Sequence, residues 1–562
     1  MNDTDVDCLF VHVPKADNHY LPIGDFFNIT YMPMGLPALA EVVRRSGYRT
    51  EVIHLGVEWL NEPSFNIVQA LEGRSIRAIG LPLYWHYQSF DVIEVARALK
   101  AAHPEAFVFL GGITAGYFAG EIVTRFPFID GVLRGHSEGS CLALVQALST
   151  DGDLGRVANL THRGADGRVR DTAVTGRPAP APPIDSLVFG DLSVMRHPEV
   201  YASTFGFPLA YGREFSRVEN GTMLSMARPF FPLFTGRGCP WLCTFCGGNR
   251  DTLKKVNTTS KVTWRSQDRV VEDIRRAMEF GYKTMSLCFD PTPSHDDYYV
   301  TLFEKIRAAG LGCDFYFECW GLPTPRFVRE FRRTFPSPES YLGISPDAGN
   351  EAVRLKNKQP YYTDADLFQT LDVLGEHEVS CDVFYTIALP GETLATARDT
   401  ARQTQQIADR YRNARRIMTW SVQLEPGSPQ FERPADFGMV TDRSCFLDFY
   451  NVHGGAHGDT YSSLGFKIEG YFGDSRDDGD IADFERHLQH IKCMEFCFVG
   501  KDPRFRNDPA SGRQHCFERR TLLADRRGHA RPSRAIGEGF DYTDALTEEN
   551  RHRGERARFS WL

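Results

Sequence analysis

Three cysteines, Cys239, Cys243 and Cys246, stand at C-x3-C-x2-C spacing in one short loop. An apolar run at 230–234 precedes them and is typical of a buried strand. Thiolates on so short a loop converge on one point, and soft sulfur ligands select zinc, copper(I) or an iron–sulfur cluster. Three ligands leave one coordination position open, which predicts a reactive site, because a purely structural site is closed. Glycines that let the backbone wrap a bulky group flank the cysteines at 236, 238, 247 and 248.

Length and composition narrow the class of protein. A chain of 562 residues is too long for one core, so roughly two to four domains are expected. Its net charge of −9 argues against a nucleic-acid partner. Thirteen cysteines without a secretory signal predict a reducing, cytoplasmic location. No apolar run of about 18 residues is present, so no membrane partner is expected.

The first part of the chain alternates strands with helices, which predicts an α/β fold with a doubly wound, Rossmann-like parallel sheet. Such sheets bind ligands beyond the carboxyl ends of their strands, where the turns 111–116 and 134–139 fall. The predicted strands are 8–13, 50–55, 78–83, 106–110 and 131–133, and the helices are 35–46, 64–72, 90–102 and 118–125.

A second series of strands and helices follows a proline-rich connector at 176–183. Together with the strand at 230–235 it predicts six βα units. We therefore divide the chain into 1–150, a bridging segment 151–228, a barrel 229–435 and an α-rich extension 436–562. The further strands are 283–289, 313–319, 340–345, 380–387 and 416–423, and the helices are 267–280, 297–309, 325–334, 350–356, 364–376 and 393–410. Ser266 is a possible N-cap of the first of these helices.

Polar residues stand where the predicted barrel strands end, and catalytic groups of such barrels belong there. Carboxylates around one rim suit an amino group and ribose hydroxyls. The alternative for Ser345, Asp347 and Thr393 is a role as helix N-caps. The residues at the strand ends are Asp290, Glu318, Ser345, Asp347, Glu392 and Glu425.

The cysteine spacing resembles the radical S-adenosylmethionine (SAM) superfamily, whose barrels are partial and have six βα units. The resemblance implies that Cys239, Cys243 and Cys246 hold a 4Fe–4S cluster whose fourth iron binds SAM. It places Phe245 beside the adenine, and Leu389 to Thr393 resembles the family's G-L-P-G-E-T turn. A three-cysteine zinc loop is the alternative, although no histidine or further cysteine follows within twenty residues. The implied SAM-binding residues are Phe245, Gly247, Gly248, Asp290, Glu318, Ser345, Asp347 and Glu392.

Residues 29–47 and 230–248 together look like cobalamin-binding-domain radical SAM proteins. The resemblance implies that the two glycine turns cradle cobalamin through Gly111, Gly112, Thr114, Gly135 and Glu138. Trp85, in the aromatic run Tyr84 to Tyr87, would pack against the corrin ring. The sequence departs from the family's D-x-H-x-x-G motif, because Gly24 lies five residues after His19, which weakens His19 as a cobalt ligand. A scaffold without a ligand is the alternative.

The resemblance implies methyl transfer to an unactivated carbon of a small molecule, with flavodoxin or ferredoxin as the electron donor. Cyclisation, rearrangement or oxidation without methyl transfer is one alternative, and a non-catalytic zinc- or cobalamin-binding scaffold is another. The extension is expected to cap the substrate pocket, with a partly disordered tail. Within it, a loop at 453–457 and a helix at 483–498 carrying His490, Cys493 and Cys497 could bind metal, although a buried helix face explains the latter.

Overall fold

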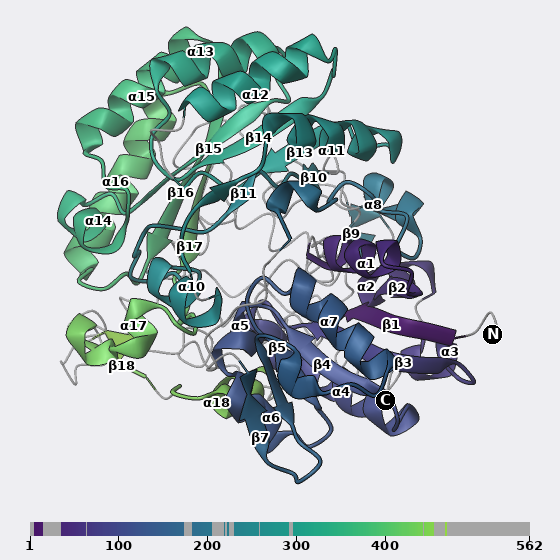
Figure 1. Cartoon of the computed structure of the whole chain (residues 1–562). Helices are drawn as coiled ribbons and strands as arrows, with labels where there is room; N and C mark the ends of the chain where they lie inside the picture. The colour runs from purple at the N-terminus through teal and green to yellow at the C-terminus, as the bar shows by residue number, and fades with distance from the viewer. Residues whose placement is uncertain are drawn as a thin grey trace.

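The computed structural model describes residues 5–14, 35–62, 65–172, 182–204, 218–219, 222–223, 230–257, 259–291, 296–441, 443–454 and 467–468. The expectations for His19, for most of the proline-rich connector and for the helix at 483–498 lie outside these residues. In Figure 1 the first sheet, in purple and blue, lies below the barrel, in teal and green.

The first sheet has seven strands in the order β2-β1-β3-β4-β5-β6-β7. The first five strands in this order are parallel, which confirms the doubly wound sheet, while β6 and β7 pair antiparallel. These last two strands fall after residue 150, in the stretch assigned to the bridging segment, so the sheet continues to Asp171. The strands are β1 (Asp5–His12), β2 (Thr50–His54), β3 (Ser75–Pro82), β4 (Phe107–Gly111), β5 (Gly131–Leu133), β6 (Leu160–Arg163) and β7 (Val169–Asp171).

Helices cover both faces of this sheet, because its strands are apolar on both sides. Leu36, Ala40 and Val43 of α1 share one core with Cys141 and Leu144 of α7. The other face is covered by α4, α5 and α6. The sequence did not predict α2 or α7, and it took the start of α5 for a turn. The helices are α1 (Gly35–Arg45), α2 (Leu55–Asn61), α3 (Ile67–Ala70), α4 (Ser89–Ala102), α5 (Ile113–Tyr117), α6 (Ala119–Arg125) and α7 (Glu138–Ser149).

The second sheet has six parallel strands in the order β10-β13-β14-β15-β16-β17, which confirms the six βα units. The strands are β10 (Phe230–Pro232), β13 (Thr284–Leu287), β14 (Asp314–Cys319), β15 (Tyr341–Asp347), β16 (Ser380–Ile387) and β17 (Ala414–Ser421). The helices are α10 (Arg250–Asn257), α11 (Gln267–Glu279), α12 (Asp296–Ala308), α13 (Pro325–Thr334), α14 (Glu351–Asn357), α15 (Asp364–Glu376), α16 (Leu394–Arg410) and α17 (Pro429–Glu432). Ser266 stands at the N-cap of α11, but its side chain makes no capping hydrogen bond.

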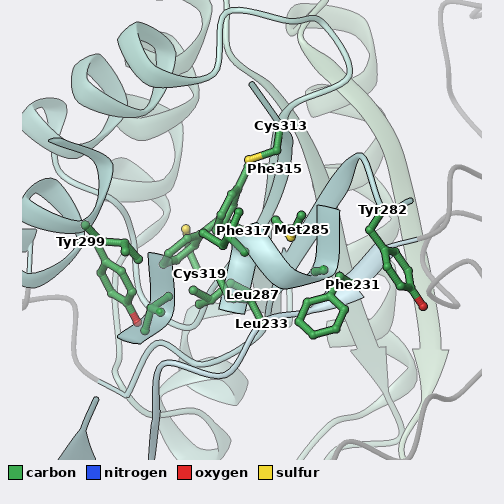
Figure 2. Close-up of a cluster of buried hydrophobic side chains, with 14 of the residues drawn as sticks. Phe231, Leu233, Tyr282, Met285, Leu287, Tyr299, Cys313, Phe315, Phe317 and Cys319 are labelled. Atoms are coloured by element: carbon green, nitrogen blue, oxygen red, sulfur yellow. The ribbon is translucent and has the colours of Figure 1, made fainter. Parts of the chain in front are cut away.

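Alternation along the barrel strands separates a dry outer core from a lumen. Phe231, Met285, Leu287, Phe315 and Phe317 belong to the outer core shared with the helices, and Figure 2 shows them side by side. The intervening residues point the other way and form a separate small cluster. That lumen cluster comprises Phe230, Tyr316, Tyr341 and the partly buried Cys288.

The chain returns to the first sheet after the barrel, through α18 (Phe446–Gly454). The backbone N–H groups of Phe446 and Leu447 donate to the Glu121 carboxylate at 2.8 and 3.2 Å. Tyr450 donates its hydroxyl to Glu94 of α4 at 2.7 Å. The described start of the extension therefore packs on the first domain, as Figure 1 shows for α18 and α6.

The remaining described elements are short. They are α8 (Pro198–Thr204), the strand pairs β8 (Val218–Glu219) with β9 (Thr222–Met223) and β11 (Gly236–Arg237) with β12 (Thr263–Trp264), and β18 (Met439–Val440) with β19 (Lys467–Ile468). Among the described helices, none combines the length and the apolar character that crossing a bilayer requires.

Candidate cofactor site between the two sheets

The cysteine loop leaves the first barrel strand and ends in α10. Cys239, Cys243 and Cys246 are all partly buried free thiols. Burial raises the pKa of Cys246 to about 12, and negative charge on Cys243 and Cys239 adds to this rise, so the three sulfurs lie near one another. Burial likewise raises the pKa of Cys239 to about 11. Metal binding at this loop must therefore release protons from the thiols.

Among the residues that the structure describes, no three His, Cys, Asp or Glu side chains are arranged to hold a single metal ion. A set of cysteine thiolates is the usual ligand set of an iron–sulfur cluster.

The end of α14 and the segment that follows it form hydrogen bonds to the cysteine loop. The backbone N–H of Gln359 donates to Cys243 Sγ at 3.3 Å, and the Leu242 N–H donates to Gln359 Oε1 at 2.9 Å. Thr244 N–H donates to the Asn357 carbonyl at 3.0 Å, and the Thr244 hydroxyl donates to Asn357 Oδ1. Hydrogen bonds to a ligating sulfur tune the potential of an iron–sulfur cluster.

Replacing Asn357 by alanine should loosen the loop and lower the iron that reconstituted protein retains. The Asn357 side chain is 1% exposed and donates to the carbonyls of Val353 and Pro390, both at 2.8 Å. Its loss leaves buried polar groups without hydrogen-bond partners, which lowers the free energy of unfolding by about 2–3 kcal/mol. Iron content and thermal unfolding check both effects.

The matched control is Asn350→Ala at the other end of α14, where Asn350 caps the helix. It should cost about 1 kcal/mol of stability but leave iron retention unchanged. Equal iron loss in both variants would mean that instability, and not loop anchoring, sets the iron content.

The other side of the loop rests on the turn after β17. Asn249 donates its amide to the carbonyls of Cys246 at 2.6 Å and Gly427 at 2.9 Å, and its Oδ1 accepts from the first turn of α10. A Cβ at Gly247 would lie 2.8 Å from the Pro426 carbonyl oxygen, which requires glycine there. Phe245, predicted beside the adenine, is partly buried and packs on the core that extends into the first domain.

Polar side chains gather at the barrel rim as the sequence predicts. Lys358 Nζ lies 2.9 Å from Asp347 Oδ2, and both side chains are at most 10% exposed. Burial raises the pKa of the Glu318 carboxyl, which accepts a hydrogen bond from the Cys288 thiol. Charges of Lys358 and Asp347 also act on Glu318, so these groups form one buried polar cluster at the mouth.

The alternative role as helix N-caps is wrong for two residues and correct for one. Ser345 and Asp347 both lie within β15, and Asn350 caps the following helix instead. Thr393 does cap α16, where its hydroxyl accepts from the Thr396 N–H.

Two rim carboxylates have partners in their own surroundings. Asp290 accepts from the Trp320 N–H at 3.1 Å. Glu392 is 2% exposed, and its Oε2 accepts from the backbone N–H groups of Ala388 at 2.6 Å and Leu389 at 3.4 Å. The Glu392 carboxylate therefore closes its own turn through Oε2, and its expected contact with SAM stays a prediction.

The first domain presents the end of β3 to the cysteine loop. Gly112 has φ +97°, and a Cβ there would lie 2.6 Å from the Leu83 carbonyl oxygen. Thr114, at the N-terminus of α5, donates its hydroxyl to the Tyr84 carbonyl at 2.7 Å. The Gly111–Thr114 turn thus holds the segment that starts the aromatic run.

The aromatic run lies at the meeting of the two domains. Half of the Tyr84 side chain is exposed. Its phenol end is desolvated, which raises its pKa, and negative charge on Cys246 and Glu425 raises that pKa further. Trp85 stacks on Tyr87 with ring centroids 6.1 Å apart, and the buried His86 places Nε2 3.5 Å from Glu425 Oε1.

The turn at 134–139 contacts the barrel, where Gly135 and Glu138 have protein partners. A Cβ at Gly135 would lie 2.9 Å from the Val256 carbonyl oxygen of α10. The Glu138 carboxylate, 6% exposed, accepts hydrogen bonds from Nη1 and Nη2 of the Arg237 guanidinium. Both residues are thus engaged by barrel residues about 100 positions further along the chain.

His136 should make the protein less stable in mild acid. Burial lowers its pKa to about 4, and the charge of Arg237 adds to this effect. An unfolded chain protonates this group near pH 6.5. Between about pH 6.5 and 4 the unfolded state therefore binds a proton that the folded state does not, and stability falls by up to ~3 kcal/mol as the pH drops.

Urea unfolding at several pH values checks this dependence. In His136→Gln the free energy of unfolding should fall less steeply between pH 6.5 and 4, because one proton fewer is taken up on unfolding. An unchanged slope would show that other groups account for the loss.

Sequence reasoning missed the residues that hold the site from outside. Asn357 ends α14, Lys358 and Gln359 follow it, and none of the three belongs to a motif. Arg237 lies just before the first cysteine, and its sequence neighbours indicate no partner for it. The one available signal was the density of polar residues just after α14. Their roles depend on contacts that are distant in the chain.

Comparison with known families matches both parts of this arrangement. The Radical SAM superfamily model matches residues 233–404, and the B12 binding domain model matches residues 27–145. The barrel is therefore similar to the radical SAM superfamily, and the first domain is similar to B12-binding domains. A B12-binding domain ahead of a radical SAM domain supports a 4Fe–4S cluster, SAM and cobalamin as the cofactors.

Curated relatives are about a quarter identical to this chain over the parts that align. The hopanoid C-3 methylase of Methylococcus capsulatus is 24% identical over 293 residues, which cover 51% of this chain and 48% of the relative. The cytidylyl-2-hydroxyethylphosphonate methyltransferase of Streptomyces wedmorensis is 23% identical over 322 residues, covering 51% and 56%. The chain thus spans about half the length of the curated relatives it matches.

Solved structures share the whole architecture. The radical SAM methyltransferase TsrM from Kitasatospora setae superimposes with a TM-score of 0.59 at 13% identity, covering 98% of this chain and 100% of that one. The cobalamin-dependent radical enzyme OxsB gives a TM-score of 0.54 at 12% identity, covering 98% and 79%. At these identities the likeness concerns the fold.

The residues present fit these cofactors. Three neighbouring thiols on one loop, with no fourth ligand from the loop itself, suit a cluster with one open iron. A half-exposed aromatic, Tyr84, at the carboxyl edge of a doubly wound sheet suits a flat tetrapyrrole.

Proposed function

We propose that this chain is a cobalamin-dependent radical SAM enzyme that transfers a methyl group to an unactivated carbon of a small molecule. The observation that carries the proposal is the juxtaposition of two cofactor edges. The C-terminal edge of the first sheet contacts the chain on both sides of the cysteine loop, through Glu138 and Arg237 before it and through Arg134 and the Lys255 carbonyl after it. A methyl carrier and a radical source must act on one substrate, so their sites have to share one space.

When bound, the cluster supplies one-electron cleavage of SAM, and cobalamin supplies methyl carriage. The cysteines fix the cluster at the barrel mouth, and the segment 357–359 holds their loop in place. The Lys358–Asp347 pair and the Glu318 carboxyl offer charge and hydrogen bonds to the amino-acid and ribose groups of SAM. The remaining SAM contacts that we propose are Phe245, Gly247, Gly248, Asp290 and Ser345.

In the first domain we propose that Trp85 and the Gly111–Thr114 turn line the cobalamin site. Both lie at the carboxyl ends of β3 and β4, where doubly wound sheets bind their ligands. We further propose that the enzyme works in the cytoplasm with an electron donor of the flavodoxin or ferredoxin kind. An external one-electron donor is required because SAM cleavage consumes an electron on each turnover.

The names of the curated relatives support methyl transfer, since two of them are a methylase and a methyltransferase. One observation favours a second reading, in which the radical closes a ring without moving a methyl group. The anaerobic magnesium-protoporphyrin IX monomethyl ester cyclase of Synechocystis is 29% identical over 149 residues, or 26% of this chain.

SAM with a deuterated methyl group separates the two functions. Reconstituted enzyme is incubated anaerobically with this SAM, cobalamin, a reductant and fractionated metabolites of the source cells. We expect a product that carries the label together with 5′-deoxyadenosine. A new product without label would reject methyl transfer and support the cyclase-like alternative.

A further inference from the structure

Three polar links join the first domain to the barrel around the cysteine loop. Before the loop, Glu138 pairs with Arg237. After it, Arg134 donates to the Lys255 carbonyl of α10 at 3.0 Å. Opposite it, His86 lies 3.5 Å from Glu425. The loop that binds the cluster is thus held against the first domain from several sides.

Two of these links involve an arginine, and the Glu138–Arg237 link before the cysteine loop is the more buried of the two. Glu138 and Arg237 are 6% and 13% exposed, and two guanidinium nitrogens meet two carboxylate oxygens. Glu138 is the first residue of α7, where a helix N-terminus favours negative charge. Arg237 stands two residues before Cys239 and is held in β11 by pairing with Thr263 of β12. A two-point contact of this kind fixes orientation as well as distance.

Beside this ion pair, glycines of the first domain let α10 of the barrel approach closely. A Cβ at Gly116 would lie 2.8 Å from Val256 Cγ1, and Gly135 approaches the backbone of the same helix. Figure 1 shows α10 between the barrel and α5 of the first domain. Because α10 follows the cysteine loop directly, the first domain contacts the chain on both sides of the cluster ligands.

We propose that Glu138 and Arg237 are positioning residues that set the separation and orientation of the cobalamin edge relative to the cluster. In this assignment Glu138 does not contact cobalamin; it acts through Arg237 on the loop of Cys239. The inference rests on the proposed function, since it concerns the geometry between the two cofactors. A misplacement of about 1 Å between reacting groups can cost about 10²-fold in rate.

The test compares Glu138→Gln with the charge swap E138R/R237E in the full chain, reconstituted with cluster and cobalamin. The first readout is the magnetic interaction between cob(II)alamin and the reduced cluster, seen as splitting of the cob(II)alamin EPR signal. We expect Glu138→Gln to keep wild-type iron and cobalamin contents and 5′-deoxyadenosine formation but to lose the splitting. The charge swap should restore it.

The matched control is Glu51→Gln. Glu51 pairs with Arg74 at 2.8 Å, and both side chains are partly buried, but both residues belong to the first domain. This variant should show the wild-type splitting. A second measurement needs no cofactor: hydrogen–deuterium exchange of the apo proteins should rise in peptides covering 134–149 and 230–242 for Glu138→Gln only.

Each outcome decides the proposal. Loss of bound cobalamin in Glu138→Gln without rescue by the swap would show that Glu138 contacts the cofactor and would overturn the assignment. Unchanged splitting and unchanged exchange would also overturn it. If wild-type protein binds no cobalamin, the proposed function fails by itself, and faster exchange in Glu138→Gln, reversed by the swap, would still show that the pair locks the two domains.

Discussion

A serine in place of Cys239, Cys243 or Cys246 is expected to remove the cluster and reduce SAM cleavage to background. The loss should reach at least ~10³-fold, equivalent to ~4 kcal/mol of activation free energy. The physical reason is that three thiolates are the loop's full set of soft ligands, and an alcohol does not replace a thiolate on iron. The absorbance of the reconstituted protein and 5′-deoxyadenosine formation after reduction measure the two effects.

The matched control is Cys445→Ser, which alters a partly buried free thiol just before α18, away from the cysteine loop. It should retain the brown colour and wild-type cleavage. If a serine at one of the three loop positions left both intact, the ligand assignment at that position would be wrong.

The second large effect concerns stability. Arg265→Met should lower the free energy of unfolding by about 3–5 kcal/mol, because it leaves the Asp273 carboxylate buried without its partner. Arg265 is 1% exposed, and its Nη1 lies 2.5 Å from Asp273 Oδ2. The same guanidinium donates to the carbonyls of Phe234 at 2.9 Å and Leu187 at 3.3 Å. It therefore ties the segment before the barrel to the strand that leads into the cysteine loop.

Urea unfolding of the variant measures this cost. The double variant R265M/D273L removes both charges and should recover most of the lost stability, since a buried pair can be replaced by apolar residues at little cost. A single variant as stable as wild type would show that the pair contributes nothing and that the Asp273 carboxyl is neutral in the fold.

Most barrel elements could be predicted because their signals are local. The helices predicted at 325–334 and 364–376 have the same bounds as α13 and α15, whose starts carry local signals, the Thr324 cap before Pro325 and the Thr363 capping box. By contrast α7 begins after Ser137, which makes no side-chain capping bond, and its start lies in a glycine- and serine-rich turn. The short strands β6 and β7 are stabilised by pairing with β5, a contact that no local pattern reveals.

In the candidate site, too, residues with a local sequence signal could be predicted and residues with distant partners could not. The three cysteines could be found because their spacing along the chain already determines that they meet. The roles of Glu138 and Gly135 could not, because their partners Arg237 and Val256 lie about a hundred residues away and a glutamate in a turn fits many roles. For Glu392 the family turn was found, but whether its carboxylate faces a ligand or its own backbone depends on the fold of that turn.

The central claim is that three cysteines hold an iron–sulfur cluster whose open iron binds SAM. EPR of the anaerobically reconstituted and reduced protein tests it most directly, recorded with and without SAM carrying ¹⁷O in its carboxylate. We expect a [4Fe–4S]⁺ signal whose shape changes on addition of SAM and which gains hyperfine coupling to ¹⁷O. A cluster signal indifferent to SAM, or no cluster signal at all, would contradict the account.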